Sequence, residues 1–250
     1  MTPEDSVASL WVTLAFIAMT AFATALGGLV VTLRRRWDAA LLHYFVALGA
    51  GFMLAAAVLE MMPVSASMTT MAPVLMLAGY LLIHFVEHTV VPHFHFGEET
   101  HPEHVGVGVG MSALVGLSIH SFFDGISVAS GFAISPRLGL LLFIAIILHK
   151  APEGFTIASI MLAGGYSRRA AQLSSVAVGA ASLVGAVAMQ PFHALVGEGL
   201  AFSAGVTLYV AASDLIPEVN RGERGGVAVM VFVGVLLYYV TEHFIEAIGF

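Results

Sequence analysis

The sequence predicts an all-α integral membrane protein of about eight transmembrane helices. Of its 250 residues, 59% are hydrophobic and only 10% are charged, and the mean hydropathy is +0.95. An ordinary soluble domain has about a quarter of its residues charged, because its surface faces water. The hydrophobic residues also form long runs and not the alternating pattern of a transmembrane β-strand. These observations make the lipid bilayer the natural solvent of the chain.

Each hydrophobic run is long enough to cross the bilayer core, for which about 20 apolar residues are needed. Short polar or Gly/Pro segments separate the runs and are expected to be loops. The amino-terminal segment is acidic and lacks the basic start of a cleaved signal, so the first run is expected to remain as a helix. In chain order, the expected helices span residues 8–31, 39–62, 72–92, 108–133, 138–162, 170–192, 196–217 and 226–249.

The distribution of arginine predicts the orientation in the membrane. Positive residues of short loops stay on the cytoplasmic side, and nearly all arginines follow the first, fifth or seventh run. Only Arg137 lies in a loop of the other parity. Both termini are therefore expected outside the cytoplasm, and the loop after the third run inside it. The arginines on the expected cytoplasmic side are Arg34, Arg35, Arg36, Arg168, Arg169, Arg221 and Arg224.

Two pairs of matching segments predict an internal repeat. AGFMLAAAVLEMMP at residues 50–63 aligns without gaps with AGVTLYVAASDLIP at residues 204–217, an offset of 154. LLIHFVEH at residues 81–88 matches LLYYVTEH at residues 236–243, an offset of 155. Apolar helices share Leu and Ala by composition alone, but composition does not explain the shared acid-x-x-Pro and Glu-His pairs. A true repeat is the favoured interpretation.

The offset corresponds to five helices, an odd number, so the two copies are expected to cross the membrane in opposite senses. Residues 1–92 form the first copy and residues 168–250 the second, with the fourth and fifth helices between them in residues 105–162. Inverted repeats are a recurring plan of secondary transporters, whose binding sites lie near the midplane. A binding site is therefore expected on the fourth and fifth helices.

These two helices each contain the motif His-x-x-x-acid-Gly. His120 and Asp124 belong to the first copy, and His149 and Glu153 to the second. Residues four apart lie on one helix face, so two facing helices offer four nitrogen and oxygen ligands. This set suits Zn(II), Fe(II), Mn(II) or Cd(II), and the absence of cysteine excludes thiolate ligands. One buried pair would be read as structural, but two copies at membrane depth favour an ion pathway.

With both motifs, the acid-x-x-Pro helices and a histidine-rich loop, the sequence resembles the ZIP family of divalent metal-ion transporters over nearly its whole length. The resemblance implies a 3+2+3 arrangement of helices with inverted outer repeats, and movement of zinc and related metals toward the cytoplasm. It implies a primary site of His120, Asp124, His149 and Glu153, with Met53 where some members place a thioether ligand. A bacterial-type member is expected in the inner (plasma) membrane.

The sequence departs from the family pattern at the second of two adjacent metal positions. Members with two metals use an Asn in helix 4, an acid after the first helix 5 ligand and a Glu in helix 6. This chain has Ser121, Lys150 and no acid in residues 170–192. It is therefore expected to hold one metal, with the ammonium of Lys150, its only lysine, in roughly the electrostatic role of the second ion. Snorkelling of Lys150 to an interface is the alternative.

Further histidines and acids lie outside this motif pair. The loop in residues 88–107 holds five histidines and three glutamates, which predicts weak metal binding on the cytoplasmic side; a solvated loop is the alternative. Glu60 and Asp214 occupy matching repeat positions and could attract cations at the pore mouths. No feature indicates binding to nucleic acid.

The main rival interpretation is an intramembrane metal-dependent hydrolase, in which a bound metal would activate water. This interpretation predicts a His-Glu-x-x-His helix or a comparable closed ligand set, and the sequence has no such helix. We therefore expect no enzymatic activity and no cofactor. The expected partners are the lipid bilayer and divalent metal ions carried as substrate, while a homodimer is left open.

Overall fold

The computed structural model describes residues 3–33, 39–90, 107–217 and 225–248. These residues are almost entirely helical, and no strand occurs among them. They contain eight helical segments long and apolar enough to cross a membrane, which confirms the predicted all-α membrane fold. In chain order the elements are α1 (Pro3–Leu33), α2 (Ala39–Ala55), η1 (Ala56–Met61), α3 (Met62–Met68), α4 (Ala72–Phe85), η2 (Val86–Val90), α5 (Val107–Ile134), α6 (Pro136–Ala163), α7 (Arg168–Met189), η4 (Gln190–Leu195), α8 (Val196–Tyr209), η5 (Val210–Leu215) and α10 (Gly225–Ala247).

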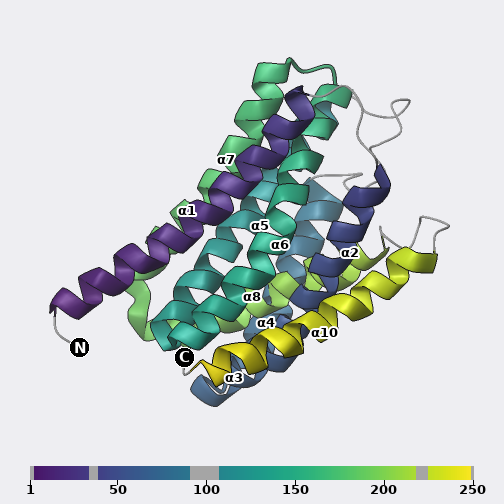
Figure 1. The fold of residues 1–250 in the computed structure, drawn as a ribbon. Helices are drawn as coiled ribbons and strands as arrows, with labels where there is room; N and C mark the ends of the chain where they lie inside the picture. The colour runs from purple at the N-terminus through teal and green to yellow at the C-terminus, as the bar shows by residue number, and fades with distance from the viewer. Residues whose placement is uncertain (1–2, 34–38, 91–106, 218–224, 249–250) are drawn as a thin grey trace.

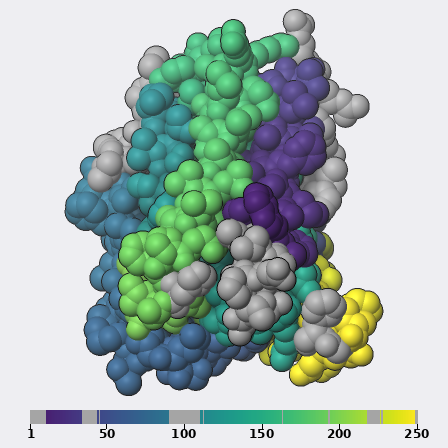
Figure 2. Space-filling view, turned by 90° about the vertical axis from the view of Figure 1, so that its left-hand side faces the viewer, coloured from purple at the N-terminus to yellow at the C-terminus, as the bar shows by residue number. Residues whose placement is uncertain are grey.

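The outer surface of the helices is apolar. Phe22 on α1, Val184 on α7 and Phe232 on α10 are 64%, 59% and 72% exposed. Figure 2 shows the face along which α7 runs in green, with α1 beside it in purple. In water, so much exposed apolar surface would drive association, whereas lipid tails are as apolar as these side chains. The chain is an integral, multi-pass membrane protein.

The described helices pack in two groups. In the first group, α1 and α5 each pack against both α6 and α7. In the second group, α4 packs along α8 and α2 packs along α10. The groups meet where α5 contacts α8 and where α6 contacts α2. Figure 1 shows α1 and α7 side by side along one edge of the molecule and α10 along the other.

Glycines allow the closest helix contacts inside each group. A Cβ on Gly27 of α1 would collide with the Ala151 carbonyl of α6, and one on Gly125 of α5 with the Ser182 carbonyl of α7. In the second group, a Cβ on Gly51 would collide with the carbonyl of Val231 on α10. At the boundary between the groups, a Cβ on Gly49 would make only an ordinary contact with α6. Packing is therefore tightest within each group.

The second group contains contacts that recur at the offset found in the sequence. Gly51 lies against the carbonyl of Val231, and Gly205 lies against the carbonyl of Met76. The π-helical segments η1 and η5 also occupy positions 154 residues apart, and each contains one acid of the aligned motif. These matches support the proposed repeat. The division into two inverted copies and the 3+2+3 arrangement stay predictions.

The orientation in the membrane also stays a prediction. Figure 1 shows that α1 begins and α10 ends at the same end of the molecule, as an even number of spans requires. Arg34 to Arg36, Arg221 and Arg224 lie outside the described residues, as do residues 91–106 of the histidine-rich loop. The role predicted for that loop is therefore not addressed by the structure.

Adding one methyl group at Gly51 is expected to destabilise the protein. In Gly51→Ala, the new Cβ would press on the backbone of α10, and overpacking of this kind costs about 1–3 kcal/mol. The apparent thermal unfolding midpoint in detergent should fall. Gly116→Ala is the matched control, because a Cβ on Gly116 of α5 meets no atom within 4 Å among the described residues outside its own helical turn. Equal midpoints for the two variants would contradict the proposed close packing.

Candidate metal centre

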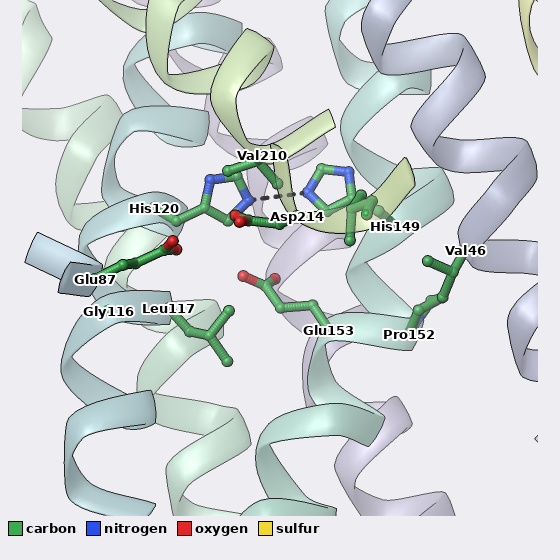
Figure 3. Close-up of a pocket in the computed structure, with 11 residues that line it drawn as sticks. Val46, Glu87, Gly116, Leu117, His120, His149, Pro152, Glu153, Val210 and Asp214 are labelled. Carbon is green, nitrogen blue, oxygen red and sulfur yellow. Dashed lines mark hydrogen bonds between the residues drawn. The ribbon is translucent and has the colours of Figure 1, made fainter. Parts of the chain in front are cut away.

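Helices α5 and α6 bring three of the predicted ligands together. His120 and Asp124 lie one turn apart on α5, with Nε2 3.2 Å from Oδ2. His149 of α6 places its Nε2 3.4 Å from the same carboxylate oxygen and 3.4 Å from Nε2 of His120. The ligand atoms of all three lie within 4.8 Å of one another. Figure 3 shows the two imidazole rings facing each other across the gap between the helices.

Hydrogen bonding and burial prepare these atoms to bind a cation. Nδ1 of His149 lies 3.2 Å from the carbonyl oxygen of Ala145, so that with its proton on Nδ1 the ring presents the Nε2 lone pair to the centre. His120, Asp124 and His149 are all at most 4% exposed. Oδ1 of Asp124 has no hydrogen-bond partner among the described residues. A buried carboxylate oxygen without a donor is a ready acceptor for a metal ion.

Glu153, the fourth predicted ligand, points into the same region but is bonded to other groups. Its Oε2 lies 2.6 Å from Nζ of Lys150, and its Oε1 accepts a hydrogen bond of 2.7 Å from Ser121. Lys150 also lies 2.6 Å from Oδ2 of Asp124. The ammonium therefore joins Glu153 to the three-residue group, and direct ligation by Glu153 stays a prediction.

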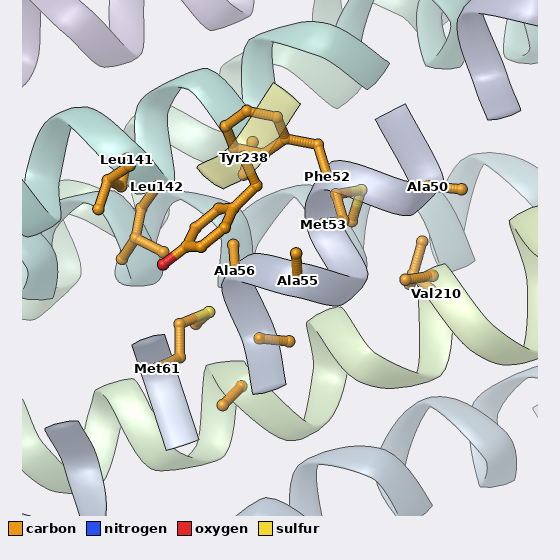
Figure 4. Close-up of a cluster of buried hydrophobic side chains, with 14 of the residues drawn as sticks. Ala50, Phe52, Met53, Ala55, Ala56, Met61, Leu141, Leu142, Val210 and Tyr238 are labelled. Carbon is orange, nitrogen blue, oxygen red and sulfur yellow. The ribbon is translucent and has the colours of Figure 1, made fainter. Parts of the chain in front are cut away.

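Met53, the predicted thioether ligand, is fully buried in the hydrophobic core. Figure 4 shows it beside Phe52, in a cluster of apolar side chains that also includes Tyr238 of α10 and Val210 of η5. It does not line the cavity at the histidines. Its role as a ligand stays a prediction for which the described geometry gives no support.

A narrow cavity reaches the two histidines from one side. The cavity volume is about 20 Å³, which is enough for about one water molecule or a small ion. Its lining includes Gly116 and Leu117, one turn before His120, and Pro152 and Glu153 after His149 (Figure 3). The cavity thus lies toward the start of α5 and the end of α6. This is the end of the molecule expected to face the cytoplasm.

Two acids from the second group also line this cavity. Glu87 of η2 and Asp214 of η5 lie beside each other, and both are less than 9% exposed. The sequence predicts that Asp214 attracts cations at a pore mouth, and in the structure Asp214 lines the cavity that contains the histidines. Glu87 was not identified as a site residue, although the Glu-His pair of the repeat contained a signal. Four helical segments therefore contribute polar groups to the centre.

At the opposite end of the boundary, an ion pair joins the two groups. Arg137, in the first turn of α6, lies 2.7 Å from Glu242 and 3.5 Å from Glu246, both on α10. Nearby, the hydroxyl of Tyr238 donates a hydrogen bond of 3.2 Å to Glu60. Arg137, the one arginine that the sequence places in a loop outside the cytoplasm, thus has carboxylate partners on a helix of the second group.

A comparison with protein families identifies the chain. The model of the family described as the ZIP zinc transporters matches residues 95–225, just over half of the sequence. The chain belongs to the ZIP family of zinc transporters. The matched region includes α5 and α6, so the family assignment and the three-residue centre concern the same part of the molecule.

Individual family members have similar sequences over part of their length. A protein named zinc transporter ZIP9 from Micropogonias undulatus is 29% identical over 159 residues, 58% of this chain and 50% of that protein. Zinc transporter GufA from Myxococcus xanthus is 31% identical over 144 residues, 55% of this chain and 56% of that protein. The chain spans about half the length of the curated relatives it matches.

Proposed function

We propose that the protein transports divalent transition-metal ions, with zinc as the main substrate and iron, manganese or cadmium as further candidates. The observation that carries this proposal is the buried set of two imidazoles and a carboxylate at the boundary between two helix groups. These ligands suit zinc. Membership of a zinc transporter family favours transport over the alternative of an intramembrane hydrolase.

We propose alternating access as the mechanism. The ligands lie on α5 and α6 of the first group, whereas Glu87 and Asp214 of the cavity belong to the second. Glycine contacts hold each group together, and the boundary between the groups is less tightly packed. Movement of one group against the other would carry the ligands away from the cavity acids. The centre would then become accessible from the opposite membrane face.

The proposed direction is toward the cytoplasm. The cavity lies at the end of α5 that follows the histidine-rich loop, and the arginine pattern places that loop in the cytoplasm. The ion pair of Arg137 with Glu242 joins the two groups at the other end. This arrangement fits an inward-facing state in an inner membrane, with both termini outside the cytoplasm.

Reconstitution tests the proposed function. Purified protein in liposomes that contain a metal-sensitive dye is expected to admit zinc faster than protein-free liposomes, and a panel of Fe(II), Mn(II) and Cd(II) would give the substrate range. Mg(II) serves as a hard-cation control, because it prefers oxygen ligands and retains its waters. Absence of flux for every transition metal in well-folded protein would contradict the proposal.

Neutralising either cavity acid is expected to slow zinc transport. Glu87 and Asp214 are adjacent carboxyl groups, and Glu87→Gln or Asp214→Asn takes one acid out of the pair beside the path to the histidines. The loss of this acidic group should reduce zinc flux by about 3- to 10-fold at low ion concentration. Glu198→Gln is the matched control, because Glu198 lies in the first turn of α8, away from this cavity. An equal loss in all three variants would show that the effect is not specific to the cavity.

A further inference from the structure

The only lysine of the chain is completely buried inside a transmembrane helix. Lys150 lies in the interior of α6 and its side chain is 0% exposed. An unpaired ammonium at such a position would be strongly destabilising, because hydrocarbon offers no solvation for the charge. The groups around Lys150 therefore have to satisfy its charge and its three N–H donors.

Three oxygen atoms surround the ammonium at equal distances. Nζ lies 2.6 Å from Oδ2 of Asp124, 2.6 Å from Oε2 of Glu153 and 2.6 Å from Oγ of Ser121. Each N–H thus has one acceptor, and two acceptors are carboxylates, which give short charge-assisted bonds. Ser121 in turn donates to Oε1 of Glu153. The ammonium occupies the position between two carboxylates that a bridging metal ion would need.

This arrangement divides the acids of the centre between two cations. Glu153 has both oxygens engaged by Lys150 and Ser121, whereas Asp124 offers the ammonium one oxygen and leaves Oδ1 without a hydrogen bond. Asp124 can therefore contact the ammonium through one oxygen and a metal ion through the other. Both histidine Nε2 atoms lie within 3.4 Å of Oδ2, the oxygen that also contacts the ammonium, so the proposed metal position lies directly beside Lys150.

We propose that Lys150 is the built-in second cation of the centre and fixes its capacity at one divalent ion. His120, Asp124 and His149 bind that ion, and Glu153 neutralises the ammonium. A second metal ion cannot displace Lys150, because its stem is anchored in α6 and its charge would be left buried without a partner. This inference rests on the proposed function and specifies how many ions the site holds.

Zinc stoichiometry tests the inference. Zinc bound to purified protein in detergent is measured by equilibrium dialysis and elemental analysis, and only the zinc lost in a matched Asp124→Asn variant is counted. This subtraction removes ions held by the histidine-rich loop. Wild type and Lys150→Arg are each expected to bind one ion per chain. Lys150→Glu supplies a third carboxylate in place of the ammonium and is expected to bind two, and the double variant Lys150→Glu/Glu153→Gln should return to one.

Zinc affinity gives a second measurement that does not depend on a charge reversal. Lys150→Met keeps the length of the stem and removes the competing positive charge, so zinc affinity should rise about 10-fold. If Lys150 had only a structural role, zinc binding in this variant would be unchanged or weaker.

The possible failures can be told apart. Two Asp124-dependent ions in the wild type, or one ion in a folded Lys150→Glu variant, would overturn the role of Lys150. Zinc affinity in Lys150→Met that does not rise would also overturn it. Absence of Asp124-dependent zinc in the wild type would instead overturn the proposed metal centre itself.

Discussion

Replacing Asp124 with asparagine is expected to reduce zinc flux in proteoliposomes at least about 100-fold, because the variant removes the only carboxylate of the three-residue centre without changing its volume. His120→Ala and His149→Ala should have similar effects, since each removes an imidazole ligand. Glu153→Ala should also lose most of its flux, because it leaves the Lys150 ammonium with a single carboxylate partner. The measurement is the initial rate of zinc uptake at equal protein content.

Two controls separate loss of ligands from loss of folding. Ser130→Ala changes a buried polar residue on α5, the same helix as Asp124, and is expected to transport zinc at close to the wild-type rate. Thermal unfolding of every variant checks that the helices remain assembled. Wild-type flux in all four site variants would contradict the assignment of the centre.

A cysteine introduced in the cavity is expected to make transport sensitive to thiol reagents from one side only. The chain has no native cysteine, and in the described part of the chain a Cβ on Gly116 meets no atom of a neighbouring helix within 4 Å, so Gly116→Cys fits the cavity wall. A membrane-impermeant thiol reagent applied on the cytoplasmic side should then block most of the zinc flux. The adduct would obstruct the space beside the two histidines, which the cavity lining places next to Gly116.

Applying the reagent to one membrane face at a time distinguishes a block of the cavity from nonspecific inactivation of the protein. Val184→Cys on the lipid-facing surface of α7 is the matched control and should keep its flux after treatment. The unmodified cysteine-free protein should be insensitive from either side. Block only from the external side would reverse the orientation that the arginine pattern predicts.

The sequence carried most of the information about the fold, because crossing a bilayer restricts both length and composition of a helix. The second expected span, residues 39–62, corresponds to α2 with η1, and the fifth, residues 138–162, lies within α6. The internal π-helical segments were not predicted, because apolar periodicity does not report a single extra residue in a turn. The pattern of apolar residues also did not predict which helices of the two groups contact each other.

For the site, the four-residue spacing correctly placed His120 above Asp124 on α5. It could not determine which groups would bond to Glu153, because both Lys150 on its own helix and Ser121 on the neighbouring helix compete for its oxygens. The sequence analysis did not identify Glu87 as a site residue, because helix packing cannot be derived from the spacing of residues along one helix. Glu87 lies on another helix, and the packing of α4 against α8 brings it beside Asp214.

The lysine also determines how membrane voltage acts on the proposed carrier. With formal charges on Asp124, Glu153 and Lys150, the centre carries −1 without a divalent ion and +1 with one. A centre without the ammonium would carry −2 and 0, so voltage would act only on its unloaded form. Each elementary charge that crosses 100 mV changes the free energy by about 2.3 kcal/mol. In a cell with a negative interior, voltage would therefore assist both the inward step of the loaded carrier and the outward return of the unloaded one.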